Sequence, residues 1–97
     1  MPKHKNQQSL GEALQEFIAA NKLQKGIDEV KVKEAWERLM GNGVNHYTQS
    51  IALRGETLYV SLSSSVLREE LGLGNSKIIA MLNDDLGREV IKKLILR

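Results

Sequence analysis

Residues 46–63, HYTQSIALRGETLYVSLS, decide the fold of this chain. Apolar and polar residues alternate on both sides of Arg54-Gly55-Glu56, which is the period of half-buried β-strands. A glycine between two such runs favours a tight turn. The stretch therefore predicts an antiparallel hairpin with one apolar and one hydroxyl-rich face. The apolar face is predicted to carry Tyr47, Ile51, Leu53, Leu58, Val60 and Leu62.

Two amphipathic segments precede the hairpin. Ser9-Leu10-Gly11-Glu12 has the pattern of a capping box, so a first helix is expected to begin there. Its apolar stripe extends to Ile18, and residues 21–26, NKLQKG, favour a stop. A second apolar stripe of helical period predicts another helix from about residue 28, ended by Gly41. Two separate helices are therefore expected before the first strand.

Two more helices and a strand are predicted after the hairpin. The serines of residues 63–65 can cap a short third helix, which is broken at Gly72-Leu73-Gly74. Asn75 or Ser76 is expected to cap the fourth helix, and Gly87 suits a left-handed residue at its end. Residues 89–97 are apolar and β-branched enough for a last strand. The order ααββααβ predicts an α+β fold in which four short helices cover one side of a three-stranded sheet.

Length, composition and the absence of enzyme motifs together favour a small noncatalytic domain. With 97 residues, nearly every apolar segment is expected to join one shared core. The chain has no Cys and two His, which argues against disulfides, metal sites and cofactors, and enzyme motifs are absent. No apolar run is long enough for a signal peptide or a membrane span, so a soluble cytoplasmic protein is expected. Residues 1–8 are predicted to be a flexible polar leader and residues 9–97 a single domain.

The residues also resemble a known family. Without its first helix the predicted order is αββααβ, the type II order of KH-like domains. The order and spacing of several segments are similar to those of the bacterial DciA-like family. These segments are AWERLMG at residues 35–41, HYT at 46–48, GETLYV at 55–60, SSSVLREEL at 63–71, and Leu82-Asn83 followed by Gly87.

This resemblance implies a fold and a function. The fold would be a single KH-like domain over residues 9–97, with an extra N-terminal helix. DciA-like proteins are understood as loaders of the replicative DNA helicase whose KH-like domain can bind nucleic acid. The implied function is a noncatalytic DNA-replication accessory protein with the replicative helicase as partner and weak binding of single-stranded DNA or RNA.

Several residues are candidates for nucleic-acid contact. KH domains usually grip phosphates with a Gly-x-x-Gly loop. The corresponding loop here, Gly72-Leu73-Gly74-Asn75-Ser76-Lys77, has Gly-x-Gly spacing, so it is either a plain turn or a phosphate contact before a helix N-terminus. Lys93 and Arg97 should share one face of the last strand. Lys3 and Lys5 form either a basic arm or a solubilising leader, and they account for the whole net charge of +2.

Four further residues are candidates for a structural or a functional role. Trp36 shares an apolar stripe, which favours a core position over a base-stacking one. Tyr59 falls on the polar face of the hairpin, where it can stack on a base, contact a partner or be an ordinary surface tyrosine. Arg68, in the segment similar to the family, is the second candidate for a partner contact. Asn83 suits a tie between helix and loop at least as well as a ligand contact.

Three functions remain open at this point. The first is the helicase-binding replication accessory protein that the resemblance implies. The second is a sequence-tolerant binder of single-stranded RNA or DNA that uses the loop at residues 72–77, the leader, Lys93 and Arg97. The third is a pure protein-interaction domain that self-associates or recruits partners through an exposed sheet edge.

Overall fold

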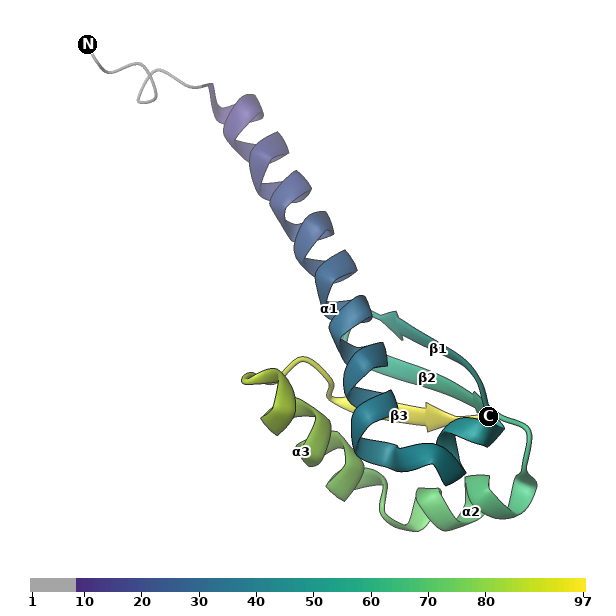
Figure 1. Cartoon of the computed structure of the whole chain (residues 1–97). Coiled ribbons are helices and arrows are strands. Elements are labelled where there is room, and N and C mark those ends of the chain that lie inside the picture. The colour runs from purple at the N-terminus through teal and green to yellow at the C-terminus, as the bar shows by residue number, and fades with distance from the viewer. Residues whose placement is uncertain (1–8) are drawn as a thin grey trace.

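A computed structural model describes residues 9–97, so the predicted leader with Lys3 and Lys5 lies outside the described residues. The fold is mixed α+β, with three helices and one three-stranded sheet in the described part (Figure 1). The order αββααβ is the one predicted for the chain without its first helix. The elements are α1 (Leu10–Tyr47), β1 (Thr48–Arg54), β2 (Thr57–Leu62), α2 (Ser65–Leu73), α3 (Asn75–Leu86) and β3 (Lys93–Leu96).

The first two predicted helices are one helix. α1 begins at the predicted capping box, where Ser9 and Glu12 exchange hydrogen bonds, and it continues through residues 21–26 without a stop. Gly26 has no positive φ, and glycine costs a helix only about 1 kcal/mol relative to alanine. Gln24 Nε2 also donates a 3.0 Å hydrogen bond to Asp28 Oδ1 across this glycine. The predicted stop was wrong because a single helical glycine is a weak signal.

Gly41 is the point where α1 changes direction. Its φ of 80° and ψ of 173° are not helical, and this region of backbone space belongs essentially to glycine. Asn45 Nδ2 bridges the kink by donating a 2.7 Å hydrogen bond to the carbonyl of Glu37. Gly41 thus interrupts the helix as predicted, but the chain turns helical again up to Tyr47. Tyr47 was wrongly placed on the apolar face of the first strand.

The N-terminal part of α1 projects from the body of the protein. In Figure 1 it extends away from the sheet, and the longest dimension of the described chain is 63 Å. The apolar stripe that was predicted to join a shared core is therefore exposed to solvent, as at Leu14 and Phe17. The expected arrangement of four short helices, all over the sheet, was wrong.

The sheet combines antiparallel and parallel pairing. β1 pairs antiparallel with β2 around the two-residue turn Gly55-Glu56, where Gly55 has a φ of 63°, so the predicted hairpin is confirmed. β2 pairs parallel with β3, and the strand order is β1-β2-β3. β3 spans residues 93–96 instead of the predicted 89–97, because the backbone groups of Val90 and Ile91 bond to the side chain of Asn83 and not to a neighbouring strand.

The core lies between α1, α3 and one face of the sheet. Trp36 is 0% exposed, and its Nε1 donates a 3.2 Å hydrogen bond to Thr48 Oγ1, so the predicted core position is confirmed. This bond satisfies the one polar atom of the indole. The other buried side chains are Val32, Ala35, Leu58, Val60, Leu62, Ile78, Leu82, Val90, Ile91 and Leu94.

The ends of α2 and α3 follow the predictions in part. Ser64 caps α2 by accepting a 3.1 Å hydrogen bond from the Leu67 amide. Gly74 precedes α3 and no side-chain cap is present there, so the prediction of Asn75 or Ser76 as cap was wrong. Gly87 ends α3 with a φ of 82°, which confirms the predicted left-handed residue.

Asn83 ties α3 to the segment before β3. Its Oδ1 accepts hydrogen bonds from the Val90 and Ile91 amides at 3.0 and 2.9 Å, and its Nδ2 donates to the Ile91 carbonyl at 2.7 Å. These bonds satisfy backbone groups beside two buried side chains. The structural reading of Asn83 is the one that the structure supports.

Candidate nucleic-acid interface

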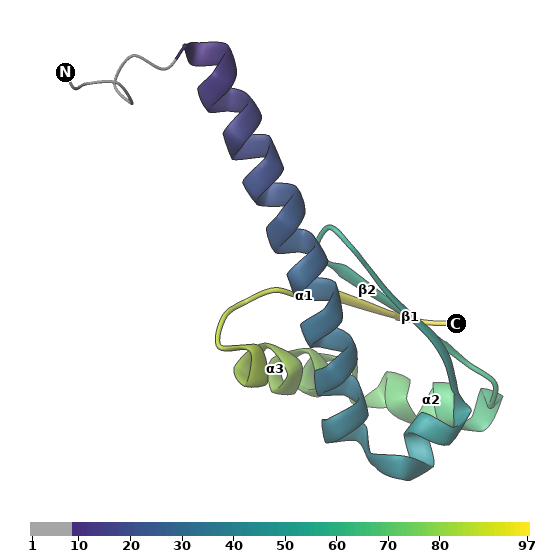
Figure 2. The ribbon, with the colours of Figure 1, turned by 45° about the horizontal axis from the view of Figure 1, so that its top comes forward.

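In the part of the chain that the structure describes, the helices leave one face of the sheet uncovered. Leu58, Val60 and Leu62 point into the core, so the alternate residues of β2 point to the other side. Figure 2 shows the strands beside the helices, with α1 and α3 on one side of the sheet. Residues paired directly across strands share a face. The open face therefore carries Arg54, Thr57 and Lys93 in one row, Ala52, Tyr59 and Ile95 in the next, and Ser50, Ser61 and Arg97 in the third.

Tyr59 occupies the middle of this open face. It lies on the central strand between Ala52 and Ile95, and its side chain is half-buried by these neighbours. The guanidinium of Arg97 lies over its ring, 4.8 Å from the ring centre. A guanidinium at this distance is attracted by the negative face of the aromatic ring. The pair therefore places a cation on one face of an aromatic ring at the surface of the sheet.

The charged side chains of the open face are all cations. Its nine residues include Arg54, Lys93 and Arg97 and no Asp or Glu. Lys92 Nζ, next to this face in the sequence, lies 3.4 Å from a carboxylate oxygen of Glu56, so its charge is paired. A neutral domain can still attract an anion where its cations gather on one surface.

The α2–α3 loop forms a separate candidate site. Gly72, Gly74, Ser76 and Lys77 lie at the junction of the two helices, and Lys77 is exposed. Asn75 Nδ2 donates a 3.0 Å hydrogen bond to the Leu94 carbonyl, which ties the loop to β3. The loop is on the helical side of the sheet, whereas Lys93 and Arg97 project from the open side. These two predicted groups do not come together on one surface.

Arg68 contacts the protein itself. Its NH1 donates a 2.9 Å hydrogen bond to the carbonyl of Leu62, the last residue of β2. The side chain therefore joins the start of α2 to the end of the strand before it. This contact accounts for the residue without a partner protein.

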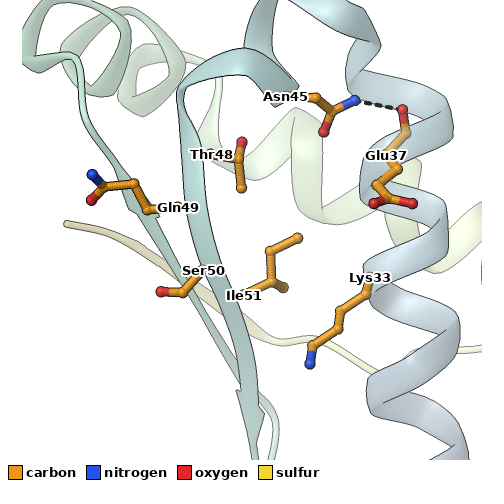
Figure 3. A pocket seen from close by; sticks show the side chains of 7 residues that line it. All are labelled: Lys33, Glu37, Asn45, Thr48, Gln49, Ser50 and Ile51. Carbon is orange, nitrogen blue, oxygen red and sulfur yellow. Dashed lines mark hydrogen bonds between the residues drawn. The ribbon is translucent and has the colours of Figure 1, made fainter.

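A groove between α1 and β1 was not predicted from the sequence. It has a volume of about 430 Å³, and Figure 3 shows Lys33 and Glu37 on α1 facing the outer edge of β1. Their opposite charges give the groove no preference for an anion. The remaining lining residues are Asn45, Thr48, Gln49, Ser50 and Ile51.

Arg54 is the cation of the open face that sequence reasoning missed. Alternation along the hairpin already placed it opposite Thr57, on the same face as Tyr59, so a signal existed. No sequence pattern predicted that Lys93 lies beside Thr57, because this position depends on the parallel pairing of β2 with β3.

Within residues 9–97, no group of three or more His, Cys, Asp or Glu side chains is arranged to hold a metal ion. None of the helices in this part of the chain has the length and apolar character needed to cross a membrane. The site defines a small α+β domain with an exposed, basic sheet face.

Comparison with known proteins identifies the family of this domain. The model of the family described as "Dna[CI] antecedent, DciA" matches residues 9–96, so the chain belongs to the DciA family. Membership implies a role in DNA replication in association with the replicative helicase. No curated protein and no solved structure matches the chain.

Proposed function

We propose that this protein is a noncatalytic replication accessory factor that binds the replicative DNA helicase and weakly holds single-stranded nucleic acid on its open sheet face. Family membership supports the helicase as partner. The observation that carries the nucleic-acid part is the position of Tyr59 between the flanking cations Lys93 and Arg97 on one uncovered surface. The KH-like character expected from the sequence is part of this proposal.

The chemistry of the open face fits a single strand better than a duplex. An aromatic ring stacks on an unpaired base, and this interaction tolerates any base sequence. Arg54, Lys93 and Arg97 can each approach a phosphate, while Ser50 and Ser61 supply hydrogen-bonding hydroxyls along the same strand rows. With only three cations, the affinity should be weak and sensitive to salt.

The α2–α3 loop is less suited to this role. One of its polar side chains, Asn75, is already bonded to β3, and the spacing of the glycines differs from that of a phosphate-gripping loop. Lys77 remains as its only cation. Substitution of Lys77 therefore tests the loop without changing the open sheet face, so one experiment distinguishes the two candidate surfaces.

The test of nucleic-acid binding is a salt titration by fluorescence anisotropy with a labelled oligo-dT strand. If three phosphates are neutralised, log K should fall with log salt at a slope near −2. Lys93→Gln should reduce the magnitude of this slope and Lys77→Gln should not. An affinity that does not change with salt would refute binding through the phosphates, and an effect of Lys77→Gln alone would move the site to the loop.

The helicase part is tested by a pull-down with the purified replicative helicase, with and without nuclease. Direct binding predicts equal recovery of the helicase in both arms. Recovery that disappears with nuclease would show that nucleic acid bridges the two proteins. No recovery in either arm would contradict the helicase as partner of this chain.

A further inference from the structure

The N-terminal part of α1 is an exposed apolar helix. Within residues 9–97, the first side chains of α1 that bond to another element are Asp28, which pairs with Arg88, and Glu29, which accepts from the Leu53 amide. Before them, Leu10 is 87% exposed and Phe17 is 63% exposed. An isolated helix of this length is marginal in water, and tertiary packing normally supplies its stability. The segment is thus in need of a partner surface.

One stripe of this helix has the spacing of a coiled-coil seam. Residues recur at alternating intervals of three and four, which is the period of two helices that pack side by side. The stripe holds three large apolar residues, two alanines and one uncharged polar residue. Its members are Leu10, Ala13, Phe17, Ala20, Gln24 and Ile27.

The seam is complementary to itself when a second copy runs in the opposite direction. Such pairing places Leu10 of one copy beside Ile27 of the other and Phe17 beside Ala20, so a large ring meets a small residue. Ala13 then meets Gln24. Each contact occurs twice, as a two-fold symmetric interface requires.

The charges on the projecting helix favour the same orientation. Its first half carries Glu12 and Glu16, and its second half carries Lys22 and Lys25. An antiparallel pair brings the acidic half of each copy near the basic half of the other. A parallel pair would bring like charges together, which costs free energy.

The length of the projecting helix matches this arrangement. Leu10, at the start of α1, reaches Ile27 of the second copy, which is the last residue before Asp28 bonds to the body. The two bodies then lie at opposite ends of the helix pair and do not compete for space. Leu14 and Leu23 flank the seam and widen its apolar surface.

We propose that the occupant of this seam is a second copy of the chain, in an antiparallel helix pair over residues 10–27. Five large apolar side chains of each copy would lose roughly 1,000 Å² of exposed surface in total, at ~100 Å² each. This area is at the low end for specific interfaces, so the dimer should be reversible and depend on protein concentration.

Sedimentation equilibrium of the full chain and two matched variants tests the proposal. Phe17→Glu places a carboxylate in the seam, whereas Ile18→Glu makes the same change about 100° around the helix, outside it. We expect a monomer–dimer equilibrium that Phe17→Glu weakens about tenfold or more, because an unpaired buried carboxylate is costly, and that Ile18→Glu leaves nearly unchanged. A wild-type chain that stays monomeric at all concentrations, or equal losses in both variants, would overturn the proposed seam.

Cysteine cross-linking tests the orientation, because the chain has no Cys of its own. Ala13→Cys and Gln24→Cys chains are mixed and oxidised, and antiparallel pairing predicts a disulfide between the two different variants. Disulfides that form mainly within each variant alone would indicate parallel pairing and refute the model. Neither readout depends on nucleic acid or helicase, so its failure is distinct from a failure of the proposed function.

Discussion

The guanidinium of Arg97 lies 4.8 Å from the centre of the Tyr59 ring, although the two residues are far apart in the sequence. Parallel pairing of β2 with β3 makes them neighbours, because Tyr59 lies opposite Ile95 and the next residues on this face are Ser61 and Arg97. The pair is the centre of the basic surface to which we assign nucleic-acid binding.

Tyr59→Leu should weaken the binding of oligo-dT while the domain remains folded. A stacked base contributes about 1–3 kcal/mol, so we expect a loss of roughly 5- to 150-fold in affinity. Tyr47→Leu is the matched control, because Tyr47 is an exposed tyrosine at the end of α1, outside the open face. Fluorescence anisotropy of both variants gives the comparison, and equal affinities would remove Tyr59 from the interface.

Gly26→Ala should stabilise the protein by up to about 1 kcal/mol and increase its helical circular dichroism. The reason is that Gly26 lies inside a continuous helix, with no positive φ and, among the described residues, no atom within 4 Å of the added Cβ apart from its chain neighbours and the backbone of its own helix. Thermal unfolding checks the change. Destabilisation would show instead that residues 21–26 end the helix, as the sequence pattern predicted.

Gly41→Ala should destabilise the protein by about 1–3 kcal/mol, because its backbone region is strained for any residue with a Cβ. Gly43→Ala is the control two residues away, with no positive φ and open space for the methyl group. It should be neutral or slightly stabilising. Urea unfolding of both variants measures the difference, and similar free energies of unfolding would contradict the kink at Gly41.

Asp28 should make stability depend on pH in the acid range. Desolvation by burial tends to raise its pKa, but hydrogen bonds from Arg88 and Gln24, with the charges of Arg88 and Lys31, hold the pKa below its ordinary value of 3.8. A lowered folded-state pKa means that the ionised form stabilises the fold above the ordinary pKa and that this contribution is lost as pH falls through the lowered value.

Melting temperatures of the wild type and Asp28→Asn between neutral pH and about pH 2 test this linkage. The wild type should be the more stable protein at neutral pH, and the difference should shrink as the carboxylate is protonated. A difference that stays constant across this range would exclude the ionised carboxylate as its source.

The sequence by itself determined the local elements of the fold. The hairpin around Gly55, the capping box at Ser9, the left-handed end of α3 at Gly87 and the core position of Trp36 were all predicted. Each depends on residues within a few positions of one another, where periodicity and backbone preference act directly. The open-face position of Tyr59 followed from the same alternation.

Only the tertiary structure decided how these elements combine. The choice between a turn and a helix at residues 21–26 depends on a free-energy difference of about 1 kcal/mol. A short sequence pattern does not resolve a difference of this size. Two features depend on contacts between segments that are distant in the chain. The stripe from Leu10 to Ile18 lies beyond the body of the protein, and Lys93 and Arg97 lie on the same face of the sheet as Tyr59. Long-range strand register and helix direction are set by the burial of the whole core around Trp36, and no local stretch of sequence contains that information.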